Sequence, residues 1–202
     1  GPVIAAAMHE ALKQGCTPRS VFDEIAQARA LAPGLGLVGM VSVSIVWRLG
    51  VEQTIAHARR AGLDGFIFPD LLLEDGADLI ARVRDAGLSV TLLIAPTTTP
   101  RRAEQIAKAC SGFVYLLARA GITGESSGKP EIADRVRMLR GVTNLPIACG
   151  FGIGTAEQVR AVVEHADAAI VGSALVRRMG ESAADPVAAV TAMVGDLARG
   201  LA

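Results

Sequence analysis

Strand-like and helix-like segments alternate along this chain with a spacing of about 25 residues. Six short apolar runs, near residues 37, 65, 89, 112, 145 and 168, predict strands, and each is followed by a segment that predicts a helix. Such strand–helix–strand units have right-handed crossovers and build a parallel sheet. No linker interrupts the alternation, so we predict one α/β domain over residues 1–202.

Threonine, proline and glycine mark many of the boundaries. We expect Thr17 to cap a helix whose first residue is Pro18, and Pro100 suits the same position in another helix. The predicted strands are 37–46, which runs into a loop, 65–68, 89–94, 112–117, 145–149 and 168–171. The predicted helices are 3–14, one that begins at residue 18, 51–61, 74–86, 100–109, 130–139, 155–164, 174–179 and 186–201.

Short strands at this spacing favour a barrel over an open, doubly wound sheet. A (β/α)8 barrel, or TIM barrel, typically has about 250 residues, whereas this chain has 202 residues and six predicted strands. It also begins with a predicted helix that no strand precedes. We therefore expect strands 3–8 of a (β/α)8 TIM barrel and their helices, in a single domain that is N-terminally incomplete.

Composition narrows the classes of partner. The chain is 51% hydrophobic and 20% charged, which suits a parallel sheet covered on both faces. Its 20 basic and 20 acidic residues form no block of like charge, so we expect neither a nucleic-acid nor a membrane partner. There is no apolar stretch of about 18 residues and no basic start typical of a signal peptide, which predicts a cytoplasmic protein. Three distant cysteines, Cys16, Cys110 and Cys149, predict free thiols and no metal site.

Two glycine signals follow the last two predicted strands, Gly150-Phe151-Gly152 and Gly172-Ser173-Ala174. Each alone is explained by a tight strand-to-helix turn. Together, in neighbouring loops, they expose backbone N–H groups that form a cradle for a phosphate, and in TIM barrels this cradle lies after the last two strands. A short helix predicted after Gly172 is also typical of the phosphate site of such barrels. The pair therefore predicts a phosphate site.

The run 112–124 holds Tyr115, the chain's one tyrosine, and leads into a long glycine-rich loop. Phe113 and Tyr115 lie two residues apart and share a face of the strand, which would point into a barrel. Tyr115 is then a core residue or the wall of a pocket. The loop is either a lid or an ordinary surface loop.

Together these segments resemble the α subunit of tryptophan synthase. The resemblance rests on five segments: Gly1-Pro2-Val3-Ile4, Pro69-Asp70, the run 115–124 (YLLARAGITG), Gly150-Phe151-Gly152-Ile153 and Gly172-Ser173-Ala174. Their order spans nearly the whole chain. The run 115–124 is highly specific for that family, whereas the glycine pairs alone are not.

The resemblance implies a lyase of tryptophan biosynthesis. The family cleaves indole-3-glycerol phosphate to indole and glyceraldehyde 3-phosphate, in an α2β2 complex with a β subunit that carries the pyridoxal phosphate. No cofactor is implied for the α chain itself. The implied phosphate-binding residues are Gly124, Gly152, Gly172 and Ser173. The implied substrate pocket consists of Ile4, Met40, Ile67, Tyr115 and Phe151, with Thr123 as the loop residue that meets the catalytic apparatus.

The two catalytic acids of the family have no counterpart in this chain. Both the glutamate and the aspartate would precede Gly1, so we expect these 202 residues alone to be inactive. Asp70 matches a family aspartate for which a structural or subunit-contact role is expected. Ser42 stands where a tyrosine is usual and Leu72 where a proline is usual, and both departures concern the face that would meet the β subunit.

Other chemistries have less support. A Schiff-base mechanism needs a lysine at a strand end, but the three lysines fall in predicted helices or loops: Lys13, Lys108 and Lys129. The three histidines stand alone on predicted helices without metal-ligand spacing: His9, His57 and His165. The alternative to a lyase is a non-catalytic α-like module that binds phosphate ligands or a partner.

Overall fold

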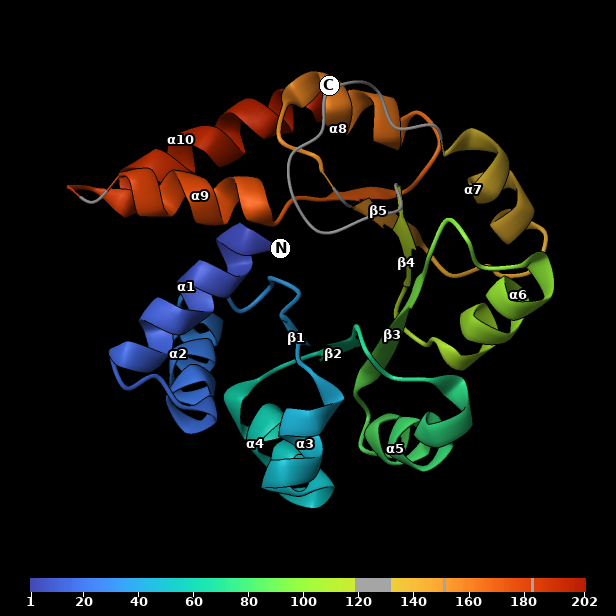
Figure 1. Ribbon diagram of the computed structural model, residues 1–202, viewed down its shortest axis with the longest axis horizontal. Helices are drawn as coiled ribbons and strands as arrows, with labels where there is room; N and C mark the ends of the chain where they lie inside the picture. The colour runs from blue at the N-terminus through green and yellow to red at the C-terminus, as the bar shows by residue number, and fades with distance from the viewer. Residues whose placement is uncertain (119–131, 151, 183) are drawn as a thin grey trace.

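The computed structural model describes residues 1–118, 132–150, 152–182 and 184–202 (Figure 1). Its strands are β1 (Val38–Met40), β2 (Gly65–Phe68), β3 (Ser89–Ile94), β4 (Val114–Leu117), β5 (Ile147–Gly150) and β6 (Ala168–Ile170). Its α-helices are α1 (Pro2–Lys13), α2 (Pro18–Leu31), α3 (Val43–Leu49), α4 (Val51–Ala61), α5 (Leu73–Asp85), α6 (Pro100–Ala109), α7 (Ala133–Arg140), α8 (Ala156–Val163), α9 (Ser173–Glu181) and α10 (Pro186–Ala198), and a 3-10 turn, Arg199–Leu201, follows.

The six strands form one parallel sheet in the order β1-β2-β3-β4-β5-β6. Because each strand lies beside its neighbour in sequence, crossovers of one hand place the helices on the same side of the sheet. A doubly wound sheet would instead reverse its strand order. Figure 1 shows that the sheet curves and that α4 to α8 lie around its outside. The predicted barrel-type α/β architecture is therefore confirmed, as a six-stranded parallel half-barrel.

Local signals place most elements correctly. The predicted bounds of β2, β3, α4 and α6 match without a shift. Thr17 caps α2, since its hydroxyl accepts a hydrogen bond from the Ser20 N–H at 3.1 Å, and Pro18 is the first helical residue. Gly62 ends α4 in the left-handed conformation, with φ 82°, a backbone geometry that favours glycine.

The predicted strand over residues 37–46 is wrong in its second half. Strand β1 ends at Met40, and Val43–Leu49 forms helix α3. The segment is rich in β-branched residues, which favour strands locally. Asp70 overrides this preference, because its Oδ1 accepts a hydrogen bond from the Val43 N–H at 2.9 Å at the start of the helix. Val43 and Val46, one helical turn apart, are then both buried.

The two faces of the sheet are different. Alternate strand residues join the hydrophobic core beneath the helices, among them Phe66, Phe68, Val90, Leu92, Val114, Leu116, Ile147 and Cys149. The residues between them point to the opposite, inner face. The inner residues include Ile67, Thr91, Tyr115 and Ala148, which are buried but lie outside that cluster. The predicted inward direction of Tyr115 is thus supported by the alternation.

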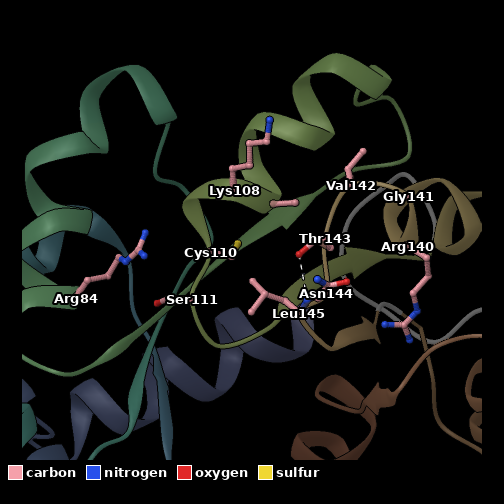
Figure 2. A pocket seen from close by; sticks show the side chains of 11 residues that line it. Arg84, Lys108, Cys110, Ser111, Arg140, Gly141, Val142, Thr143, Asn144 and Leu145 are labelled. Atoms are coloured by element: carbon pink, nitrogen blue, oxygen red, sulfur yellow. Dashed lines mark hydrogen bonds between the residues drawn. The ribbon is translucent and has the colours of Figure 1, made fainter.

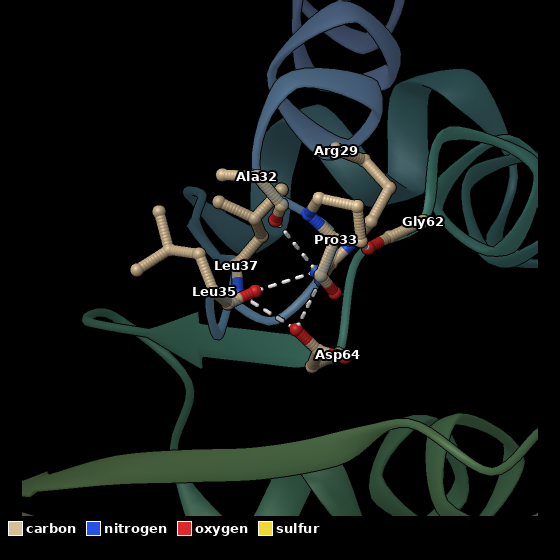
Figure 3. A network of polar contacts seen from close by, with 7 residues as sticks. All are labelled: Arg29, Ala32, Pro33, Leu35, Leu37, Gly62 and Asp64. Carbon is tan, nitrogen blue, oxygen red and sulfur yellow. Dashed lines mark hydrogen bonds and ion pairs between the residues drawn. The ribbon is translucent and has the colours of Figure 1, made fainter.

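An aspartate–arginine pair holds the amino-terminal end of β1 to that of β2 (Figure 3). Asp64 Oδ2 accepts hydrogen bonds from the Leu37 N–H and from Arg29 Nη2, both at 2.6 Å. The hydrogen bond from Leu37, followed by Arg29, keeps the pKa of the Asp64 carboxyl below its usual value. Arg29 also donates to four carbonyl oxygens, those of Ala32, Pro33, Leu35 and Gly62.

The same arrangement recurs between β5 and β6. Asp167 Oδ2 accepts hydrogen bonds from the Ile147 N–H at 2.7 Å and from Arg140 Nη2 at 2.5 Å. In both places the aspartate immediately precedes a strand. The N–H that it binds lies at the start of the preceding strand: Leu37 comes directly before β1, and Ile147 is the first residue of β5. The arginine lies in the last turn of the helix before that preceding strand. These two clamps brace the end of the sheet opposite the predicted site.

In the described part of the chain, no helix is long and apolar enough to span a membrane.

Candidate functional site

The predicted site lies at the carboxyl ends of the strands, where Tyr115 and Gly150 meet. Leu117 of β4 is the register partner of Gly150 of β5, and Tyr115 lies two residues before Leu117 on β4. Its ring leans across to β5. A Cβ atom built on Gly150 would lie 2.5 Å from Tyr115 Oη and 2.9 Å from the Cβ of Ile170. The absence of a side chain at Gly150 therefore makes room for the tyrosine ring.

Burial governs the chemistry of Tyr115. The residue is only 7% exposed, and burial raises the pKa of its hydroxyl to about 12. Within the described ranges, no hydrogen-bond partner of this hydroxyl is found. Tyr115 is thus a neutral phenol at neutral pH, with its hydroxyl on the inner face of the sheet.

Gly152 and Gly172 lie in adjacent loops. Gly150 pairs with Ile170, and each glycine comes two residues after one member of that pair. Gly152 has φ 81°, a left-handed conformation that glycine adopts most readily. At Gly172 a Cβ would meet nothing within 4 Å, so no neighbouring protein atom requires a glycine there.

Helix α9 begins directly after Gly172. Its N-cap makes no side-chain hydrogen bond, and no acidic residue occupies its first turn. The first N–H groups of a helix have no partner within the helix, so those of Ser173 and its successors point out of the amino-terminal end. The predicted short helix over 174–179 is confirmed in this position, from Ser173 to Glu181.

The predicted pocket residues are brought together only in part. Met40 and Ile67 are register partners on β1 and β2, and Ile67 is buried whereas Met40 is 54% exposed. Ile4 is half-buried in the first turns of α1, a helix that contacts α9. Thr123, Gly124 and Phe151 lie outside the described residues.

Asp70, at the end of β2, is engaged in holding two loops together. Besides the Val43 N–H, it accepts a hydrogen bond from the Ser42 hydroxyl at 2.5 Å, and that hydroxyl lies 2.8 Å from the hydroxyl oxygen of Ser44. The carboxylate thus links the loop after β2 to the start of α3. This arrangement gives Asp70 a structural task.

A family model described as "Tryptophan synthase alpha chain" matches residues 1–199. The chain belongs to this family. A tryptophan synthase alpha chain from Rhodopirellula baltica is 39% identical over 212 residues, with all of this chain and 76% of the relative covered. One from Petrotoga mobilis is 32% identical over 186 residues, with 92% of this chain and 72% of the relative covered.

Solved tryptophan synthase structures share the fold. A crystal structure of tryptophan synthase from M. tuberculosis in an aminoacrylate-bound form has a TM-score of 0.87 at 29% identity, covering 100% of this chain and 76% of the other. A mutant tryptophan synthase α-subunit from Pyrococcus furiosus has a TM-score of 0.88 at 29% identity, covering 98% and 80%. The chain therefore spans about three quarters of these tryptophan synthase relatives.

Ser42 and Leu72 are the positions at which the resemblance leads us to expect a tyrosine and a proline. The Ser42 hydroxyl donates a hydrogen bond to Asp70. Leu72 is 60% exposed and occupies the N-cap position of α5 without a side-chain hydrogen bond. Both lie at the carboxyl-terminal end of the sheet.

A basic groove lies at the amino-terminal end of the strands, opposite the predicted site (Figure 2). Its lining includes Arg84, Lys108 and Arg140, each in the last turn of its helix. Cations in that position complement the negative end of the helix dipole. Lys108 and Arg140 also form ion pairs, with Glu104 and Asp167. The positive charge of the groove is therefore explained by these helix-end positions and ion pairs, without a ligand.

Sequence reasoning missed Arg135, an arginine of α7 that reaches the carboxyl ends of two strands. Nothing in its local sequence signals this long-range role. The described residues contain no group of three or more histidine, cysteine or acidic side chains that could hold a metal ion. The three cysteines are free thiols, as predicted, although Cys16 is only half-buried.

Proposed function

We propose that this protein is the α subunit of a tryptophan synthase and that it cleaves indole-3-glycerol phosphate to indole and glyceraldehyde 3-phosphate. The juxtaposition of Tyr115 and Gly150 with the amino-terminal end of α9 carries the proposal. It places an apolar, inward-facing wall beside N–H groups that have no hydrogen-bond partner within their own helix. A substrate with a flat aromatic ring at one end and a phosphate at the other matches such a site.

The phosphate end of the ligand would lie against the two loops after β5 and β6. The N–H groups at the start of α9 and the positive end of its dipole favour an anion. The open space at Gly172 would let phosphate oxygens approach the backbone, and the Ser173 hydroxyl would add a hydrogen bond. Gly152 would contribute a backbone N–H, and Gly124 is proposed as the fourth phosphate-binding residue.

The indole end would lie on the inner face of the sheet. Ile67 and Tyr115 supply buried surface there, and Met40 supplies exposed apolar surface at the end of β1. Ile4 and Phe151 are proposed to complete the pocket, with Thr123 meeting the catalytic apparatus. Burying an aromatic ring against such residues would stabilise the complex chiefly through the hydrophobic effect.

The proton transfers need two carboxylates, one to protonate the indole ring and one to deprotonate a glycerol hydroxyl. We assign β1 to β6 to strands 3–8 of the family barrel, which leaves both acids outside the printed sequence. Asp70 is bound to Ser42 and Val43 and is poorly suited to replace them. We therefore expect the 202 residues alone to bind ligand without turnover.

The proposed partner is a β subunit that takes up the indole and carries the pyridoxal phosphate, in an α2β2 complex. No cofactor is proposed for this chain. A cytoplasmic location is proposed as well, because free thiols such as Cys110 and Cys149 persist in a reducing compartment.

Titration of the protein with glycerol 3-phosphate tests the site. Gly172→Asp places an acceptable capping residue at the start of α9, so the fold should persist, but its carboxylate should compete with the phosphate. We expect the affinity to fall by about tenfold or more. Gly34→Asp, at another glycine with no neighbour within 4 Å of a Cβ, adds the same charge elsewhere and should bind like the unmodified protein. Equal affinity for the Gly172→Asp variant would overturn the phosphate assignment.

A non-catalytic α-like module is the second candidate, and the engagement of Asp70 in a structural contact favours it for these residues taken alone. The codons that precede Gly1 in the gene separate the two functions. A glutamate and an aspartate at the family's catalytic positions support the lyase. Their absence supports a module that binds phosphate ligands or a partner without turnover.

A further inference from the structure

Arg135 joins the carboxyl ends of β3 and β4. Its Nη2 donates a hydrogen bond to the Ala95 carbonyl oxygen at 2.6 Å, and its Nη1 donates to the Leu117 carbonyl oxygen at 3.0 Å. The register of the two strands ends with the pair Ile94 and Leu116. The guanidinium therefore binds the carbonyl oxygens of the next residue on each strand, and continues the connection where the strand ladder stops.

The environment of Arg135 distinguishes it from the other arginines of α7. Burial lowers the pKa of the Arg135 guanidinium, and within the described ranges it forms no ion pair with a carboxylate. Arg137 instead forms an ion pair with Asp134 and is 76% exposed, and Arg140 is bound to Asp167. The planar guanidinium offers two donors at a fixed spacing, which matches two carbonyl oxygens on adjacent strands.

The end of β4 is held from its other side as well. The Ala118 N–H donates to the Gly150 carbonyl oxygen at 2.8 Å. Tyr115 lies two residues before Leu117, and its ring lies over Gly150. The backbone that carries the tyrosine is thus fixed between Arg135 on the β3 side and Gly150 on the β5 side.

We propose that Arg135 is a positioning residue for the aromatic end of the site, acting through the β4 backbone on Tyr115. Its hydrogen bonds determine where the inner-face ring stands relative to Gly150. The identity of the aromatic ligand as indole rests on the proposed function, whereas the positioning of β4 does not.

The first test compares two ligands that occupy different ends of the proposed site. Arg135→Met keeps the length and apolar stem of the side chain and removes both donors. We expect the affinity for indole, measured by calorimetry, to fall by about tenfold, while the affinity for glycerol 3-phosphate stays within about twofold because its partners lie on other loops. Arg135→Lys, which retains the charge with a single ammonium group, should fall between.

Arg137→Met is the matched control, since it removes an exposed arginine from the same helix. It should leave both affinities unchanged. The proposal is wrong if Arg135→Met binds indole as tightly as the unmodified protein does. It is also wrong if both ligands are weakened to the same extent, because that result reports a general loss of structure.

Hydrogen exchange supplies a readout that needs no ligand. In Arg135→Met, amides of β4 and of the end of β3 should exchange faster than in Arg137→Met, with α1 and α10 unchanged. If the unmodified protein binds no indole, the proposed function fails while this measurement still decides the role of Arg135. Unchanged exchange in β4 would overturn the positioning role.

Discussion

The ring of Tyr115 occupies the space that a side chain on Gly150 would fill: a Cβ at that position would lie 2.5 Å from the tyrosine hydroxyl oxygen and 2.8 Å from its Cε2. Gly150 is therefore required by packing inside the sheet. Gly172 is different, because a Cβ there would meet no protein atom within 4 Å. The two glycines occur in similar sequence contexts but have different roles: Gly150 makes room for the tyrosine ring, and Gly172 borders open space.

Replacing Gly150 with alanine should destabilise the protein and displace the tyrosine. Overpacking in a closely packed interior destabilises by about 1–3 kcal/mol. Urea unfolding followed by circular dichroism measures this change. Gly172→Ala is the comparison: its Cβ meets no protein atom, so only the poorer N-cap should count, and the free energy of unfolding should fall by no more than about 1 kcal/mol while glycerol 3-phosphate binding weakens. Equal stability of the Gly150→Ala variant and the unmodified protein would contradict the contact.

Removing the carboxylate of Asp70 should loosen the start of α3. Asp70→Ala deprives the Val43 N–H and the Ser42 hydroxyl of their acceptor, which should lower the free energy of unfolding by about 1 kcal/mol. Asp70→Asn retains an acceptor oxygen and should lose much less. Trp47, the one tryptophan, lies in α3, so its fluorescence reports on this helix. If alanine and asparagine behaved alike, the carboxylate would not serve as a cap.

Stability should fall in acid partly through Asp64. Hydrogen bonding to the Leu37 N–H and then to Arg29 lowers the pKa of this carboxyl below 3.8 in the folded state. Its contribution is therefore fully present above that pH and is lost as the pH falls through the lower, folded value. Asp64→Asn should show a shallower decline in the free energy of unfolding below about pH 4.

Asp23→Asn is the control for this acid dependence. Asp23 is an exposed residue of α2 whose side chain makes no hydrogen bond or ion pair with the residues the structure describes. Its variant should follow the unmodified protein from neutral pH into acid. Identical acid curves for Asp64→Asn and the unmodified protein would show that the clamp adds nothing to stability.

One thiol of three should react readily. Burial raises the pKa of the Cys110 thiol to about 11 and that of Cys149 to about 12, and both side chains are buried. Cys16 is only half-buried. At pH 8 an aromatic disulfide reagent should modify Cys16 at least about a hundredfold faster than the other two, since the thiolate is the nucleophile. Three thiols reacting at one rate would contradict the described packing.

Local signals in the sequence were enough for most of the elements. Thr17 with Pro18 marks one helix start because a hydroxyl and a fixed φ act within one turn, and Pro100 marks another. The structure adds Thr99 as the cap of that second helix. Gly62 and Gly152 mark turns because their left-handed φ values favour glycine. The alternation of side chains along β4 was also enough to assign Tyr115 to the inner face.

The contacts between distant segments could not be predicted in this way. Three of the first four residues of segment 43–49 are β-branched and favour a strand, yet a helix begins there, with the Val43 N–H bound to Asp70, 27 residues away. Nothing in the sequence around Arg135 indicates the two carbonyl oxygens that it binds, one of which is 40 residues away. Gly150 could be predicted as a turn residue but not as the partner of a tyrosine ring.

The α/β alternation, the parallel sheet and the position of the glycine pairs can be predicted from the amino-acid sequence, because they depend on periodicity and on short-range backbone preferences; short motifs are enough for the family. The folded structure was needed to show that Gly150 serves packing while Gly172 faces open space, that Asp70 binds the first N–H of α3, and that Arg135 ties β3 to β4. Those assignments depend on which atoms of remote segments come within hydrogen-bonding or van der Waals distance, and only the folded chain brings them there.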